Sequence, residues 1–525
     1  MILNDISVSL PSPSLLVTLT CGILGGWWLY YYLFDVRTKR SVVSYDKDDT
    51  RPPEVPNMSA LQFMIQLISK DGPPFVLNLA RQMNTFCYRL PGTKTFEAYI
   101  IADPLVARKI LEHPQTTKPY FFYSFFEQIS TGPSFFVQNG HRSHHVRKAT
   151  AAAFSKTNIQ GRTTHIIESI VERWVQQRLE PYLSTQDTTT TIDIDQEMIS
   201  ITTDVIFQVG FGYTMSMEER NQFVEHLNFA MNEFFLNFKF WRAWPLTAWM
   251  FPGVRKAWHA ADAIFQTCYK ILQTYRQTMA MSNPSSAATE IPTNKDESLI
   301  ALLIHDPDYS SDMERARDMV VYIFAGFETT AHCIAWTLLE LARHPKEQES
   351  LRTALVQCSS QDEARACPPL KHVIRESLRL HSPAALGSVR QLDQEMIFSQ
   401  DEHDYYKQRQ KPRRIPAGSI CIMPFWVILR NHNIFPNPDE FQPSRWEHAT
   451  EEQLQSFFPF AVGRRNCQGQ ALANAELVVV LERLVSHYEF HVVDEGRPEY
   501  FVTWKTVGTK LAVKRILTLT STASF

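Results

Sequence analysis

The chain has 525 residues, a formal net charge of −3, 44% hydrophobic and 20% charged residues, and its length alone suggests three or four domains. This composition excludes a mainly disordered chain, a fibrous repeat and a coiled-coil rod, and the near-neutral charge argues against a nucleic-acid-binding protein. Eight cysteines without a Cys-x-x-Cys pair argue against a disulfide scaffold or a cysteine-ligated structural zinc.

A candidate membrane segment comes first. Residues 15–34 form a run of 20 residues without a charge, the length that an α-helix needs to cross a bilayer, and a basic flank follows directly. The positive-inside rule places that flank in the cytoplasm and residues 1–14 in the lumen. A buried core helix is the alternative. We predict one transmembrane anchor, a basic and proline-bearing linker over 35–56, and one folded domain over 57–525.

Helical patterns dominate the body of that domain. Amphipathic segments of helical period occupy three long stretches, 157–183, 198–240 and 254–281. Short apolar strands are expected near Ala98 and after Ala384, so we predict a mainly α (α+β) domain with small β-sheets. Polar residues at 184–191 and 400–414 predict surface loops.

A long apolar stretch at 319–342 predicts one buried helix. Glu328 and His332 in its middle argue against a second membrane span. Gly326 lacks a side chain, which could open a groove over a flat ligand, and the adjacent Glu328 and Thr329 could relay protons. A core helix whose threonine bonds its own backbone is the alternative.

The most specific motif is FAVGRRNCQG at 460–469, which matches FxxGxRxCxG at every fixed position. Gly463 and Gly469 would let the backbone turn and approach a flat cofactor. A thiolate at Cys467 needs positive surroundings and backbone donors, which an arginine-rich loop leading into a helix from Gln470 would supply. The alternative for a lone cysteine is a small buried hydrophobe.

With these motifs in this order, the chain resembles the cytochrome P-450 superfamily of haem-thiolate monooxygenases. The resemblance implies that Cys467 is the axial ligand of the iron of haem b, that Phe460 shields the sulfur and that Arg465 contacts a haem propionate. It also implies that Glu328 and Thr329 are the family's catalytic acid–alcohol pair.

Three further arginines stand at positions where the family has an arginine. Glu376 and Arg379 form an ExxR pair, which is weak evidence alone because such pairs are common on helices. The resemblance adds Arg445, from the segment FQPSRW, as the third member of a structural triad. It also makes Arg390 a candidate propionate contact.

One family motif is incomplete. The family usually has WxxxR on a helix near the cysteine, and Arg147 takes the arginine position while Ser143 stands where the tryptophan is expected. His144 could substitute for the tryptophan. The basic run at 141–148, together with Arg464, suggests a docking surface for an acidic electron donor.

The resemblance implies a monooxygenase that inserts one oxygen atom of O2 into a lipophilic substrate. Electrons would come from NADPH through a P-450 reductase, with a cytochrome b-type donor as an addition, and the domain would face the cytoplasm from the endoplasmic reticulum membrane. Aromatic-rich segments at 120–136 and 234–251 fit a lipophilic substrate or a membrane-dipping surface. The alternatives are a haem-thiolate isomerase or lyase acting on hydroperoxides, and a haem sensor without turnover.

Overall fold

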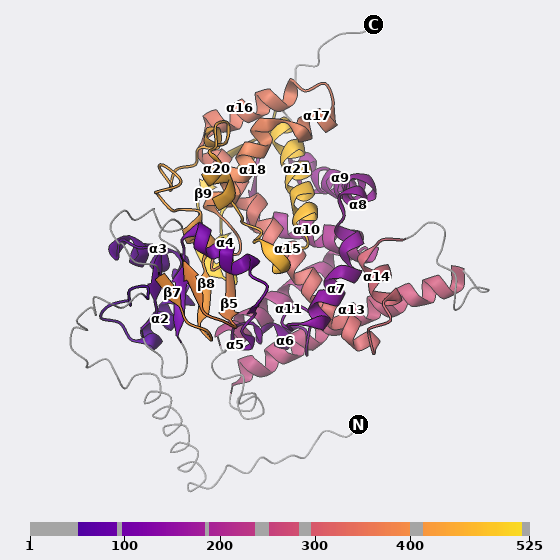
Figure 1. Ribbon diagram of the computed structural model, residues 1–525. Helices are drawn as coiled ribbons and strands as arrows, with labels where there is room; N and C mark the ends of the chain where they lie inside the picture. The colour runs from indigo at the N-terminus through magenta and orange to yellow at the C-terminus, as the bar shows by residue number, and fades with distance from the viewer. Residues whose placement is uncertain are drawn as a thin grey trace, which may run out of the picture.

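The computed structural model describes residues 51–91, 97–183, 188–236, 251–282, 296–398 and 413–516 (Figure 1). The predicted anchor and most of the predicted linker lie outside these residues. The described part is mainly helical and carries four small sheets, which confirms the predicted mainly α class with small β-sheets.

A 32-residue helix, α15 (Asp312–Arg343), passes through the core. Ser311 caps its first turn by accepting a hydrogen bond from the Glu314 N–H, and most of its residues are buried. Among the described residues, α15 is the one helix long and apolar enough to cross a membrane, but most of its apolar stretch is covered by protein. The predicted buried helix at 319–342 is thus confirmed.

Other helices surround α15, with α10 (Ile194–Phe211), α18 (Pro368–Leu380) and α21 (Gln470–His487) packed on it (Figure 1). The remaining described α-helices are α2 (Ala60–Leu67), α3 (Gly72–Gln82), α4 (Pro104–Glu112), α5 (Tyr120–Tyr123), α6 (Phe126–Ile129), α7 (His141–Ala149), α8 (Lys156–Asn158), α9 (Thr164–Trp174), α11 (Met217–Leu236), α13 (Pro252–Ser282), α14 (Leu299–His305), α16 (Pro345–Val356), α17 (Gln361–Ala366), α19 (Phe425–Ile428) and α20 (Glu451–Ser456).

The stretch of helical pattern at 198–240 contains more than one helix. The structure has two helices there, because Gly212 adopts a left-handed conformation (φ 61°) that ends α10, and α11 begins at Met217. Residues 237–240 lie outside the described part.

The largest sheet has the strand order β1-β2-β8-β5-β3. Its strands are β1 (Cys87–Arg89), β2 (Ala98–Ile101), β8 (Ile420–Met423), β5 (Ser388–Leu392) and β3 (Thr116–Thr117). Strands near Ala98 and after Ala384 are therefore present as predicted. The smaller sheets contain β4 (Thr189–Asp193), β12 (Lys510–Arg515) and β9 (Tyr488–Asp494); β10 (Arg497–Phe501) and β11 (Thr503–Val507); and β6 (Met396–Phe398) and β7 (Arg413–Ile415).

Part of the loop predicted at 184–191 is instead strand. Residues 189–191 belong to β4, which pairs antiparallel with β12 more than 300 residues later in the chain, so that Thr191 faces Ala512. A short polar strand at the edge of a sheet lacks the alternation of apolar and polar residues from which strands are predicted. Most of the segment predicted as a loop at 400–414 lies outside the described residues.

Candidate active site

The cysteine loop, residues 460–469, forms a tight turn before α21. The Cys467 N–H donates to the Phe460 carbonyl at 2.8 Å, which closes the turn and places Phe460 beside the cysteine. Gly463 has φ 78°, and a Cβ there would lie 2.4 Å from the Leu111 carbonyl oxygen, so only glycine fits. A Cβ at Gly469 would meet open space instead.

Cys467 is exposed. The surrounding protein atoms raise the pKa of the Cys467 thiol, whereas the Gly469 N–H and the nearby Arg147 act to lower it. A backbone donor and a guanidinium beside the sulfur are what a metal-binding thiolate requires.

Four cations gather next to the cysteine loop: Lys118, Arg147, Arg390 and Arg465. Burial and then the three arginines hold the pKa of Lys118 well below its usual range. Arg390 is only 1% exposed, and its Nη2 atom has no hydrogen-bond partner. Within the described residues, the charged groups that shift the pKa values of Lys118, Arg147 and Arg465 include no carboxylate. No carboxylate of the described residues therefore offsets the charge of these three side chains.

A haem fits this arrangement. Its two propionates would supply two negative charges to a buried cation cluster that has none, and the unpartnered Arg390 Nη2 is a free donor for a carboxylate. Of the four cations, sequence reasoning missed Lys118. Its Nζ donates to the Phe136 carbonyl at 2.9 Å and lies 3.4 Å from the centre of the Phe136 ring.

Helix α7 holds the cysteine loop from one side. Arg147 donates to the carbonyl and the side-chain oxygen of Asn466 at 2.8 and 3.1 Å. Arg465 donates to the Ser143 hydroxyl and, at 2.6 Å, to the Gln138 carbonyl. Ser143 is buried and His144 is exposed, so Ser143 and not His144 points inward at the position of the missing tryptophan.

One stripe of α15 lies near the cysteine loop. Tyr322 links the end of α7 to the cysteine loop, since its hydroxyl lies 2.8 Å from the Thr150 hydroxyl and 3.5 Å from Gln468 Oε1. Ala325 and Thr329 follow at helical spacing; Ala325 is exposed and Thr329 half-buried within an otherwise buried stretch. The Thr329 hydroxyl donates to the Ala325 carbonyl at 2.8 Å.

The role expected for Gly326 is wrong. A Cβ at this position would point at α10 and lie 2.8 Å from Ile206 Cδ1. Gly326 thus lets α10 and α15 pack closely, and the open stripe is formed by Ala325 and Thr329 instead.

Glu328 lies on a different face of α15 from Thr329, in a buried polar series. The Thr503 hydroxyl donates to Glu328 Oε1 at 3.1 Å and lies 3.1 Å from His332 Nδ1. His332 Nε2 in turn lies 3.3 Å from Oδ1 of Asp195 at the start of α10. Burial raises the pKa of Glu328, lowers that of His332 well below its usual value, and raises that of Asp195 to about 7.

The residues predicted as a structural triad meet. Glu376 and Arg379, both buried on α18, form a bidentate pair at 2.9 and 3.0 Å, and Arg445 Nε donates to Glu376 Oε1 at 2.9 Å. Trp446 Nε1 adds a further donor at 3.0 Å, and Arg379 also donates to three backbone carbonyls. The cluster joins α18 to the segment that precedes the cysteine loop.

Aromatic side chains from distant segments meet beside α15. Phe126, from the aromatic-rich segment 120–136, lies 4.9 Å from Phe136 and 5.7 Å from Phe324 of α15, between ring centres. Phe235 of α11 lies 5.0 Å from Phe501. The rest of the second aromatic-rich segment, 237–250, lies outside the described residues.

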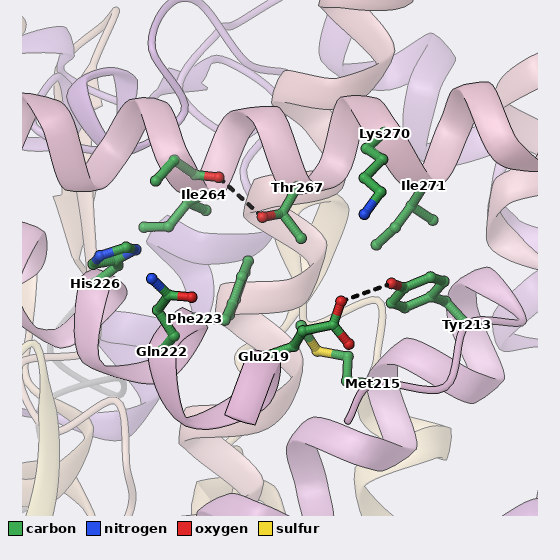
Figure 2. A pocket seen from close by; sticks show the side chains of 11 residues that line it. Tyr213, Met215, Glu219, Gln222, Phe223, His226, Ile264, Thr267, Lys270 and Ile271 are labelled. Atoms are coloured by element: carbon green, nitrogen blue, oxygen red, sulfur yellow. Dashed lines mark hydrogen bonds between the residues drawn. The ribbon is translucent and has the colours of Figure 1, made fainter. Parts of the chain in front are cut away.

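A separate pocket lies between α11 and α13 (Figure 2). It is lined by residues such as Tyr213, Glu219 and Lys270, and Tyr213 donates to Glu219 at 3.4 Å. None of the predicted site residues lines it. This pocket is distinct from the space around Cys467.

Comparisons with known proteins show the family of the chain. Residues 52–516 match the family model of cytochrome P450. The chain is 25% identical to cytochrome P450 4d2 of Drosophila melanogaster (68% of this chain, 72% of the relative) and 25% identical to cytokinin hydroxylase of Arabidopsis thaliana (74% and 72%). A shorter region is 32% identical to human cytochrome P450 4F12 (36% of each chain).

The fold is also shared with solved structures. The crystal structure of the cytochrome P450DA haem domain superposes with a TM-score of 0.70 at 18% identity, over 89% of this chain and 98% of that one. With its fold, the haem-thiolate cysteine motif and the family match in agreement, the chain belongs to the cytochrome P450 family and is a haem-thiolate monooxygenase.

Proposed function

We propose that this cytochrome P450 hydroxylates a lipophilic substrate, with Cys467 as the axial ligand of haem b. One observation carries the proposal: Cys467 is exposed next to a cluster of four cations, and Ala325 and Thr329 form an open stripe on α15, whose Tyr322 contacts the cysteine loop. Bound there through the thiolate, a haem would supply the chemistry that activates dioxygen. Arg147, Arg390, Arg465 and Lys118 would hold its propionates.

The aromatic side chains beside α15 support a lipophilic substrate. Phe126, Phe136 and Phe235 are half-buried, so they keep apolar surface available next to the open stripe. Apolar contact supplies most of the binding energy in such sites. Hydroxylation is the reaction that the name of the Arabidopsis relative states for that protein.

Glu328 is proposed to deliver protons. Because the Thr503 hydroxyl donates to Glu328, it accepts from His332 Nδ1–H, while His332 Nε2 lies 3.3 Å from Asp195 Oδ1 without a hydrogen bond between them. After Glu328 has given up its proton, the Thr503 hydroxyl proton would move to Glu328 Oε1 and the His332 Nδ1 proton to Thr503, once the Asp195 carboxyl group turns to His332 Nε2 and protonates it. Thr329, on the open stripe, would pass protons onward once its hydroxyl leaves the Ala325 carbonyl.

We further propose that an NADPH-dependent reductase docks on the cysteine side and that residues 15–34 anchor the protein in the endoplasmic reticulum membrane. Lys148 and Arg464 are exposed there and available to an acidic partner. Other members of the basic run are engaged, since Arg142 pairs with Asp318 at 3.0 Å. The docking surface is thus smaller than the run at 141–148 suggests.

The ligand assignment is tested with Cys467→Ala and a control cysteine, Cys358→Ala. Cys358 is a half-buried free thiol away from the loop. The reduced carbon monoxide spectrum should lose its thiolate band in Cys467→Ala and keep it in Cys358→Ala. A normal band in Cys467→Ala would overturn the assignment. Turnover that needs neither reductase nor dioxygen would instead favour an isomerase or lyase.

A further inference from the structure

Helix α7 carries a second cluster of side chains outside the cysteine site. His141 and His145 lie one turn apart on α7, and their ring centres are 5.8 Å apart. Asp308, in the turn between α14 and α15, approaches them, and one ligand atom from each of the three residues lies within 4.8 Å of the others. Figure 1 shows α7 beside α14.

We propose that His141, His145 and Asp308 bind one divalent transition-metal ion of the Zn²⁺ class. Two imidazoles and a carboxylate are a ligand set that Zn²⁺ accepts, with water in the fourth position. Ligand atoms around a tetrahedral zinc are about 3.3 Å apart. His145 Nδ1 and Asp308 Oδ2 are already 3.1 Å apart, and His141 and Asp308 are exposed, so they can turn to close the remaining distance.

A second carboxylate orients the central ligand. His145 Nε2 lies 2.9 and 3.0 Å from the two oxygens of Asp306, which is buried. Asp306 is itself fixed, because its Oδ1 accepts from the Asp308 N–H and its carbonyl accepts from Arg315 Nη2, both at 3.0 Å. A carboxylate on the far nitrogen holds a histidine with its other nitrogen free for the metal, as in many metal sites.

Without a metal ion, His145 lies between the carboxylates of Asp306 and Asp308. A metal ion would replace the proton on Nδ1 and keep the Asp306 hydrogen bond. It would also join α7, which carries Ser143 and Arg147, to the turn that precedes α15. The cysteine count argued only against a cysteine-ligated zinc, and this site uses none.

The experiment measures metal binding to the haem-loaded full chain in detergent, without a polyhistidine tag. Equilibrium dialysis against Zn²⁺, with Mg²⁺ as the comparison ion, gives stoichiometry and affinity. We expect one Zn²⁺ per chain, no saturable Mg²⁺ site, and affinity at least about tenfold lower in His141→Gln and Asp308→Asn. Asp306→Asn, which touches no metal, should weaken binding roughly 10- to 100-fold.

The matched control is His144→Gln, on the same helix but outside the cluster and exposed. It should bind Zn²⁺ like the wild type. Equal affinity of the wild type and His141→Gln, or an equal loss in His144→Gln, would overturn the site. A thiolate band in each variant shows that it is folded and haem-loaded, and this readout does not depend on substrate oxidation.

Discussion

Lys118 is the member of the cation cluster that most lacks a counter-charge. It is buried beside three arginines, and among the described residues its Nζ donates to the Phe136 carbonyl and lies over the Tyr123 and Phe136 rings. If a propionate supplies the anion, Lys118→Met removes a charge-assisted hydrogen bond worth about 1.5–3 kcal/mol. We expect haem to dissociate roughly ten- to a hundredfold faster, measured by transfer to an excess of a haem-free acceptor protein.

The control for Lys118→Met is Lys148→Met on α7. Lys148 is exposed, so its removal should leave haem loss unchanged. Equal rates for the two variants would show that no propionate lies at Lys118.

The residues of this cluster differ in how far sequence could predict them. Arg147 and Arg465 belong to sequence motifs, and the resemblance to the family makes Arg390 a candidate propionate contact. Lys118 follows β3, whose pairing with β5 sets Thr117 opposite Gln391 and so brings Lys118 beside Arg390. The two strands are more than 270 residues apart in the chain, and no sequence pattern near Lys118 predicts their register.

Two Glu–Arg pairs of the same helical spacing differ in burial. Glu376 and Arg379 on α18 have no exposed side-chain surface, whereas the Glu349 side chain, paired with Arg352 on α16, is 65% exposed. Glu376→Gln would leave buried Arg379 and Arg445 without their carboxylate, which costs about 3–5 kcal/mol. We expect Glu349→Gln to cost at most about 1 kcal/mol.

Thermal unfolding of the two haem-loaded variants compares these pairs. The Glu376→Gln midpoint should fall well below the wild type, or the variant should yield little haem-loaded protein, and the Glu349→Gln midpoint should stay within a degree or two. Similar midpoints for both variants would contradict a structural role for the triad. Sequence spacing alone does not separate these two pairs, because burial is set by the packing of whole elements.

The polar series between α10, α15 and β11 makes stability depend on pH. Burial raises the pKa of Asp195 to about 7, with Lys505 acting to lower it and Asp193 and Glu328 to raise it. A raised carboxyl pKa gives stability that is present below the unfolded pKa and is lost as pH rises through the folded pKa. Asp195→Asn should therefore gain stability relative to the wild type between about pH 4 and 7, by at most about 4 kcal/mol.

The measurement for Asp195 is the difference in thermal midpoint between Asp195→Asn and wild type at several pH values. The difference should grow from pH 4 to 7 and level off above. Asp195 Oδ1 and His332 Nε2 share no hydrogen bond, so lost hydrogen bonding does not explain a change. A difference that stays constant with pH would show that Asp195 does not titrate in this range.

At the scale of the whole molecule, the length-based expectation of several domains is wrong for the described residues. One buried apolar cluster runs from Val55 to Val513 and includes every region that borders the cysteine site. Length is a poor guide here because elements far apart in sequence pack around one site. The motifs that predict the site are each short and local, so they can be found without knowledge of the packing.

Two apolar segments are long enough for the proposed membrane attachment, 15–34 and α15. Helix α15 has the composition of a membrane span, but it buries Asp318, Glu328 and His332 against polar partners from other elements. Placing these groups in lipid would cost several kcal/mol each and would break those contacts. Deletion of residues 1–50 should therefore convert the protein from carbonate-resistant to carbonate-extractable, while the described domain, which begins at Arg51, keeps its thiolate band. If the protein still resists carbonate extraction after the deletion, a segment inside the domain attaches it to the membrane.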